Sequence, residues 1–204
     1  MTIDEAADAG EDAGEDAVRA SQRERLLNAA IDLFYRDGVG VGASALCKSA
    51  GISKKSMYEL YGSKDALIAA ALDRRARADA EFLLPPPGFS ASPRARLLHL
   101  FGQLEKFAQE PDYMGCAYLA VQVELKDPAH PASLVGARIK RDYLEHFFRT
   151  EAERGNAADP DLLTRQLAVL YDGASTRAGV GADDLRGLAV TTAETLLDAA
   201  GVTD

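Results

Sequence analysis

The chain has 204 residues, of which 47% are hydrophobic, and these figures are ordinary for a globular protein with its own core. No apolar run approaches the roughly 18 residues needed to cross a bilayer, and the N-terminus lacks the successive regions of a signal peptide. Two cysteines, Cys47 and Cys116, are too few for a disulfide framework or a zinc site. We therefore expect a cytoplasmic protein that does not associate with membranes.

The formal net charge of −9 is unevenly distributed. Residues 1–20 hold seven acidic residues and one basic residue, whereas residues 21–80 hold ten basic and seven acidic residues. Residues 81–204 hold twelve basic and eighteen acidic residues. Because DNA affinity depends on cations that displace counterions from phosphates, only the middle segment is suited to meet DNA.

Residues 1–20 contain little that could be buried, and the near-repeat at 9–16 is rich in acid, glycine and alanine. This composition predicts a disordered acidic tail. Two roles stay open for it, a solubilising leader and a competitor of DNA for the basic surface.

From Ser21 the pattern becomes helical, with capping-box spacing between Ser21 and Glu24 and a break at Asp37-Gly38. The buried face of this helix is predicted to hold Leu26, Leu27, Ala30, Ile31 and Phe34. A short helix over about 44–50 follows and stops at Gly51. Ser53 caps a third helix to about Tyr61, and Ser63 caps a fourth that the prolines at 85–87 end.

Helical spacing continues over about 97–108, 134–147, 160–178 and 183–200, and no segment alternates as a strand does. The predicted fold is all-α, a three-helix N-terminal helix-turn-helix head on a larger helical C-terminal domain. We place the head at 21–65 and the ligand-binding and dimerisation domain at 66–204.

A short helix, a tight turn with glycine and a second short helix form the unit that inserts its second helix into the major groove. The start of the second helix combines backbone N–H groups, lysines and hydroxyls that suit phosphate and base edges. The candidate DNA-binding residues are Ser44, Ser53, Lys54, Lys55, Ser56, Tyr58, Tyr61 and Lys64.

Three blocks carry a family resemblance, namely residues 23–34, residues 50–58 and the run Ser63-Lys64-Asp65-Ala66-Leu67. In this order and spacing they resemble the N-terminal domain of the TetR family of transcriptional regulators. The resemblance implies a homodimer that pairs through its last two helices and binds double-stranded operator DNA. It departs from the family at Leu60, where an aromatic residue or histidine is usual, and Glu59 places an anion in the recognition helix.

The resemblance also implies a pocket for a small-molecule effector in the C-terminal domain. Aromatic and polar residues with the make-up of such a site are Phe101, Cys116, Tyr118, Gln122, Tyr143 and Phe147, although residues of these kinds more often belong to a plain core. Cys116 is either a reactive sensor or a buried apolar residue. The three histidines show no ligand-like grouping, so we expect neither a metal nor a cofactor.

The sequence thus predicts a ligand-released repressor rather than an enzyme, since it holds no nucleophile–base pairing and no phosphate loop. The alternative is a helical scaffold or partner-binding protein whose head no longer reads DNA sequence.

Overall fold

The computed structural model describes residues 3–203, with side chains from residue 17 onward. These residues form helices and connecting turns without a strand, which confirms the predicted all-α class. The chain divides into two compact units, the first ending at Ala71 and the second beginning at Leu72. The division therefore falls inside a helix, six residues after the predicted boundary at residue 65.

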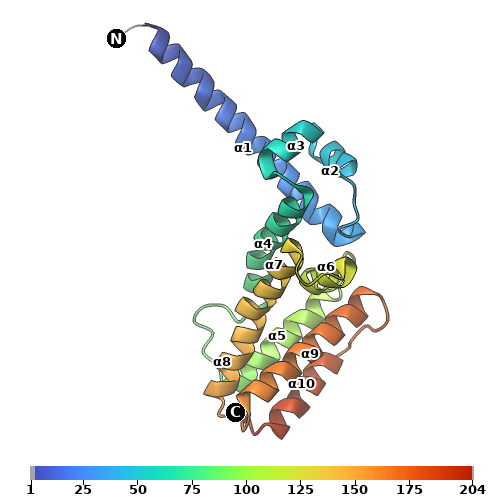
Figure 1. Ribbon diagram of the computed structural model, residues 1–204. Helices are drawn as coiled ribbons and strands as arrows, with labels where there is room; N and C mark the ends of the chain where they lie inside the picture. Colours follow the sequence, from blue (N-terminus) through green and yellow to red (C-terminus); the bar gives the residue numbers. More distant parts are fainter. Residues whose placement is uncertain (1–2, 204) are drawn as a thin grey trace. The chain divides into compact units, whose positions relative to one another are not determined.

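The first unit is a small helical bundle made of α1 (Ile3–Asp37), α2 (Ala43–Ala50), α3 (Lys54–Tyr61) and the start of α4 (Lys64–Leu83) (Figure 1). Both short helices pack on α1, and α2 also contacts α3. The buried face of α1 contains the predicted leucines, Ala30 and Phe34. Its buried partners on the other elements are Val39, Leu46, Cys47, Ala50, Met57, Leu67 and Ile68.

The start of α1 differs from the sequence prediction. The helix has its first residue at Ile3, so it includes most of the segment 1–20 that we predicted to be a disordered tail. Alanine, the strongest helix former, recurs through this segment and no proline interrupts it. Ser21 consequently lies inside the helix, where its hydroxyl accepts from Arg25 Nη1 at 3.2 Å instead of capping an N-terminus.

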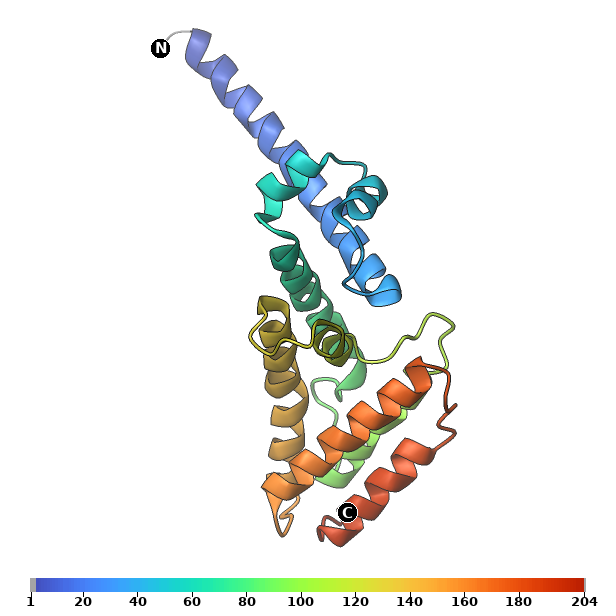
Figure 2. The same ribbon diagram turned by 45° about the vertical axis from the view of Figure 1, so that its right-hand side comes forward.

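The second unit contains the rest of α4 followed by α5 (Pro93–Phe107), α6 (Ala117–Leu125), α7 (Pro131–Ile139), η1 (Lys140–Glu145), α8 (His146–Arg154), α9 (Pro160–Gly179) and α10 (Leu188–Ala199). Within it, α10 packs against both α5 and α9, and α8 packs against α5 and α9 (Figure 2). The largest side chains at the centre of this unit are Leu97, Leu100, Phe101, Leu104, Phe148, Leu163 and Leu167.

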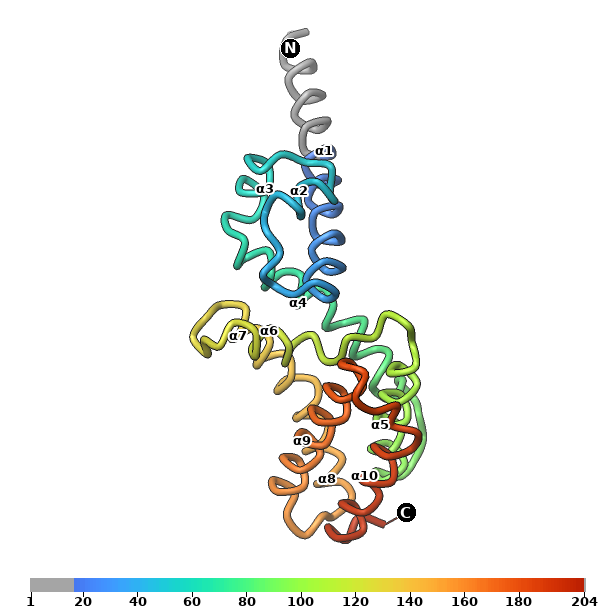
Figure 3. The backbone as a smooth tube through the Cα atoms, turned by 90° about the vertical axis from the view of Figure 1, so that its right-hand side faces the viewer, coloured from blue at the N-terminus to red at the C-terminus, as the bar shows by residue number. Residues whose placement is uncertain are grey.

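Helices α7, η1 and α8 follow one another without a break over residues 131–154 (Figure 3). The sequence predicted one regular helix here, but residues 140–145 form a π-helical turn. Such wider turns are uncommon and occur often at functional sites. This turn supplies residues to a cavity in the second unit.

The last helix starts later than predicted, at Leu188 instead of about residue 183. Leu185 and Arg186 precede it with φ values of 62° and 42°, so the backbone there is left-handed. The N–H of Leu185 donates to Asp183 Oδ1 at 2.9 Å. The leucine spacing that predicted a longer helix therefore continues into a turn, where Leu185 is buried outside the helix.

Candidate functional site

The first unit contains a tight helix-turn-helix. Helix α2 ends at Gly51, whose φ of 65° is left-handed and whose N–H donates to the carbonyl oxygens of Cys47 and Lys48. Helix α3 begins directly after Ser53, whose hydroxyl accepts from the Ser56 N–H at 3.0 Å. Only residues 51–53 separate the helices, a length typical of DNA-binding helix-turn-helix motifs.

Helix α3 has an exposed face that carries three of the predicted DNA-binding residues, Lys54, Lys55 and Tyr58. Its first turn contains no acidic residue, so the positive end of the helix dipole is not neutralised there. On the opposite face Met57 is buried, with its sulfur 3.8 Å from Cys47 Sγ. This packing fixes which face of α3 remains available to a phosphate backbone.

Two serines of the motif, Ser53 and Ser56, are hydrogen-bonded within the protein, whereas Ser44 is exposed on α2. The Ser53 and Ser56 hydroxyl oxygens lie 2.9 Å apart, so the Ser56 hydroxyl predicted to meet a base edge is already hydrogen-bonded. Lys48 and Ser49 are also exposed on α2 and were not among the predicted residues, although their spacing from the buried Leu46, Cys47 and Ala50 could have indicated them.

Tyr61 connects α3 to α1. The Arg23 guanidinium lies 4.2 Å from the centre of the Tyr61 ring, and the Tyr61 hydroxyl donates to the Arg23 carbonyl at 3.3 Å. Arg23 Nη1 in turn donates to the Leu60 carbonyl at 2.6 Å. These contacts give Tyr61 a positioning role for α3, and its predicted contact with DNA stays a prediction.

The two remaining features of the motif concern charge. Glu59 lies one turn after Lys55, and their charged atoms are 3.7 Å apart with both side chains more than half exposed. This pair offsets part of the positive charge that α3 presents to DNA. Lys64 is half-buried at the first position of α4, after Ser63, whose hydroxyl accepts from the Ala66 N–H at 3.0 Å.

The second unit contains a small, partly open cavity of about 20 Å³ between α4, α6, the α7–η1 segment and α9. This volume corresponds to roughly one water molecule. Apolar side chains of α4 and of the α7–η1 segment form most of its wall. The polar lining residues are Asp79, Tyr118, Lys140, Tyr143 and Tyr171.

Two of the six predicted ligand residues, Tyr118 and Tyr143, line this cavity. The other four do not. Gln122 donates from Nε2 to the Tyr118 carbonyl at 2.9 Å. Phe101 stacks on Phe148, with ring centres 5.9 Å apart, and Phe147 belongs to the same aromatic core. The lining residues that the sequence analysis missed include Asp79, Lys140 and Tyr171.

The polar side chains around the cavity form two linked sets. Asp79 Oδ2 accepts from Arg75 Nε at 3.0 Å and from the Tyr118 hydroxyl at 2.8 Å. Lys140 forms an ion pair with Asp172. Burial and the neighbouring Asp79 raise the pKa of Tyr118, and burial raises the pKa of Tyr171. Both phenols are therefore neutral hydrogen-bonding groups near pH 7.

Cys116 is the sixth predicted ligand residue, and it is buried beside the cavity rather than in its lining. Burial raises the pKa of its thiol to about 11. Since the thiolate is the reactive form, this environment favours the apolar role of Cys116 over the electrophile or oxidant sensor.

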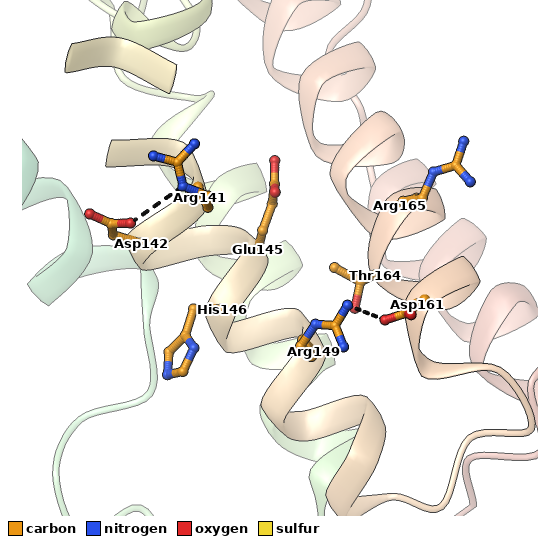
Figure 4. A pocket seen from close by; sticks show the side chains of 8 residues that line it. All are labelled: Arg141, Asp142, Glu145, His146, Arg149, Asp161, Thr164 and Arg165. Carbon is orange, nitrogen blue, oxygen red and sulfur yellow. Dashed lines mark ion pairs between the residues drawn. The ribbon is translucent and has the colours of Figure 1, made fainter. Parts of the chain in front are cut away.

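A larger open groove of about 750 Å³ lies beside η1, α8 and the start of α9 (Figure 4). Its lining is a mixture of arginines and acids, and Arg149 is ion-paired with Asp161 across the two helices. Arg165 and Glu145 have no ion-pair partner in the part of the chain that the structure describes, and the buried Thr164 hydroxyl has no hydrogen-bond partner there. The lining of the groove is therefore charged but has no excess of positive or negative residues.

Exposed apolar side chains occur on α9, directly after it and at the first position of α10. Val169 and Val180 are 73% and 72% exposed, and Leu162 and Leu188 are about half exposed. Leu162 and Val169 are seven positions apart on α9 and so share one helix face, and exposed apolar residues that share a face typically mark an interaction surface.

The geometry defines a DNA-binding protein of the helix-turn-helix class, with a separate helical unit that holds a small cavity. A sequence model described as "Bacterial regulatory proteins, tetR family" matches residues 26–71. A crystal structure described as that of a TetR transcriptional regulator from Streptomyces avermitilis is 59% identical, covers 89% of this chain and 99% of its own, and superposes with a TM-score of 0.86. The chain therefore belongs to the TetR family of DNA-binding transcriptional regulators, as predicted from the sequence.

Two further solved structures share the fold at lower identity. A TetR-family regulator from Streptomyces coelicolor is 24% identical over 89% of this chain and 97% of its own, with a TM-score of 0.79. Reduced NemR from E. coli is 22% identical over 88% and 96% of the two chains, with a TM-score of 0.70. Comparison with curated proteins finds no match. None of the described helices is long and apolar enough to cross a membrane.

Proposed function

We propose that this protein is a cytoplasmic repressor that binds operator DNA as a homodimer and leaves it when a small molecule opens the cavity. The observation that carries the proposal is the course of α4. This helix begins at Lys64, shortly after α3 ends, and its residues Ala76, Asp79, Ala80 and Leu83 line the cavity. A ligand that widens the cavity must displace this wall, and a continuous helix transmits such a displacement as a rigid element.

DNA binding is assigned to α3 and the exposed residues of α2. The test is fluorescence anisotropy on duplexes tiled from the region upstream of the gene, against random duplex, at near-physiological salt. We expect one near-palindromic site to bind with a dissociation constant at or below about 10⁻⁸ M. Double substitution Lys54→Ala and Lys55→Ala should weaken binding and reduce the salt slope by about 0.9 for each phosphate that is no longer neutralised.

The matched control is Lys106→Ala, which removes an exposed lysine from α5 in the second unit. This variant should keep the wild-type affinity and salt slope. An unchanged affinity after the double substitution would instead favour the scaffold alternative, to which the Lys55–Glu59 pair and Leu60 lend support.

Dimerisation is assigned to the outer faces of α9 and α10. Val169→Glu places a charge at the most exposed apolar position of α9, where a partner would have to bury it. We expect this variant to sediment as a monomer and to lose operator affinity, because a dimer holds two half-sites at once. The control is Val123→Glu, which makes the same change at a 62% exposed position of α6 and should leave the dimer intact. A dimeric Val169→Glu variant would show that the interface lies elsewhere.

A further inference from the structure

The charges around the cavity are balanced within the protein, and this balance restricts what the cavity can accept. We propose that the effector is an uncharged aromatic molecule with a hydroxyl group, and that the hydroxyl donates a hydrogen bond to Asp79 Oδ1. The inference rests on the proposed function of the cavity as the effector site and names the chemical class that this site takes.

The walls set the apolar part of the ligand. Ala80 and Leu83 of α4 line the cavity together with Ile139 and Leu144, and the rings of Tyr143 and Tyr171 complete its surface. Aromatic rings pack well in offset or edge-to-face arrangements against other rings. A flat aromatic body therefore matches the shape and the chemistry of this lining.

The ion pairs around the cavity determine which charge a ligand can carry. The charged side chains near the cavity form two ion pairs. Arg75 pairs with Asp79 within α4, and Lys140 of η1 pairs with Asp172 of α9. Three of these four side chains are less than a fifth exposed, and the fourth, Asp172, is 26% exposed. The sum of the four charges is zero. A charged ligand would bring an uncompensated charge into a poorly solvated site, whereas a neutral ligand would not.

The carboxylate oxygens that lack a hydrogen-bond donor determine which polar group the ligand should carry. Both bonds to Asp79, from Arg75 and from Tyr118, end on Oδ2, so Oδ1 has no donor in the described part of the chain. Asp172 Oδ1 also lacks a hydrogen-bond partner there, and it is buried. An acceptor that is buried without a donor, such as Asp172 Oδ1, is costly to leave unsatisfied. Asp79 Oδ1 is not buried in this way and is an acceptor that a molecule entering the cavity can reach. A ligand hydroxyl can donate to Asp79 Oδ1 without disturbing either ion pair.

The cavity of about 20 Å³ is too small for an aromatic ring, so the ligand must open it. Asp79 and Leu83 both lie on α4, which is the wall that the proposed function requires to move. Selectivity and release are thus expected to depend on the same helix.

The test uses three probes with one aromatic body: 2-naphthol, which is neutral, 2-naphthoate, which is anionic, and 2-naphthylmethylammonium, which is cationic. The chain has no tryptophan, so naphthyl fluorescence can be followed in titrations of the full-length protein. We expect 2-naphthol to bind at least tenfold more tightly than either charged probe. Tighter binding of a charged probe, or no binding of any probe, overturns the inference.

Charge variants sharpen the test. Asp79→Asn removes the carboxylate that pairs with Arg75 and so adds one positive charge to the balance around the cavity, and the preference for naphthol over naphthoate should therefore fall at least tenfold. Lys140→Met leaves Asp172 without its counterion, so the preference should move toward the ammonium probe. This second variant tests the inference if Asp79→Asn fails to fold. The matched control is Asp73→Asn, which removes an acid from the same helix outside the cavity and should keep the wild-type order.

Operator binding is measured on the same samples. The neutral-ligand inference and the proposed ligand-induced release from DNA can then be refuted independently. If 2-naphthol binds in the predicted order but leaves operator affinity unchanged, the selectivity of the site stands and ligand-induced release is wrong. If naphthoate is preferred and weakens operator binding, ligand-induced release stands and the neutral-ligand inference is wrong.

Discussion

The N-terminus of α10 is held by a carboxylate from α5, which makes Glu105 a sensitive position for stability. Glu105 Oε2 accepts from the Gly187 N–H at 2.7 Å, and Oε1 accepts from the Ala189 and Val190 N–H groups at 2.8 and 3.2 Å. The helix has no side-chain cap of its own at Gly187. One carboxylate from another helix therefore satisfies the N–H groups that a helix start leaves open, and its charge complements the helix dipole.

Glu105→Ala removes all three acceptors at once. Loss of an ordinary N-cap costs about 1 kcal/mol, and a hydrogen bond to a charged group contributes about 1.5–3 kcal/mol. Because Gly187 and Val190 are only half-buried, water replaces part of this stabilisation. We expect the free energy of unfolding to fall by about 3 kcal/mol, which lowers the Tm by roughly 6–12 °C for a chain of this size.

The measurement is denaturant unfolding followed by far-ultraviolet circular dichroism at fixed protein concentration, which also controls for dimerisation. Glu110→Ala is the control, since it removes an exposed glutamate a few residues further along and should change stability by less than about 0.5 kcal/mol. Equal midpoints for Glu105→Ala, Glu110→Ala and the wild type would refute the reasoning, because they would show that the three bonds contribute nothing net.

Two further predictions concern packing and protonation in the second unit. A Cβ on Gly179 would lie 2.4 Å from the Gly115 nitrogen, a backbone atom that cannot easily move, so Gly179→Ala should destabilise the protein by at least about 2 kcal/mol in the same unfolding assay. Gly102→Ala, in open space within α5, should instead be neutral or stabilising by up to about 1 kcal/mol, and similar effects of the two substitutions would contradict the close approach. Burial raises the pKa of Cys116 from 9.0 to about 11, so its contribution to stability is full below pH 9 and disappears as the pH rises through 11. Unfolding measured from pH 8 to 11 should therefore show a shallower decline for Cys116→Ala than for the wild type, by up to about 1.4 kcal/mol per pH unit, and parallel curves would show that the thiol titrates normally.

The head could be predicted from the sequence because its signals are local. Gly51 permits the left-handed residue at the end of α2, and Ser53 caps α3 within the same short segment. The family resemblance rested on those same residues. What local signals could not provide was the contact of Tyr61 with Arg23, since these residues are 38 positions apart and meet only when α3 packs on α1.

The cavity could be predicted only in part, because its walls come from five elements, namely α4, α6, α7, η1 and α9, and all but the contiguous α7 and η1 are separated along the sequence. Aromatic residues on amphipathic helices drew attention to Tyr118 and Tyr143, but the same reasoning selected Phe101 and Phe147, which the fold buries in its core. Asp79 and Lys140 resemble surface charges in the sequence, since nothing near them reveals the distant helix that covers them. Side-chain periodicity indicates that a face is buried and does not indicate what it is buried against.

The π-helical turn explains how one short segment serves both the cavity and the open groove. Lys140, Tyr143 and Leu144 line the cavity, whereas Arg141, Asp142 and Glu145 line the groove on the other side. The groove is completed by Asp161, Thr164 and Arg165 at the start of α9, the helix to which dimerisation is assigned. A ligand that widens the cavity therefore has two walls to displace, α4 and η1. Since the wider π turn interrupts the α-helical hydrogen-bond pattern between α7 and α8, η1 is the wall that we expect to yield at lower cost, and the response of the dimer interface should accompany that of α4.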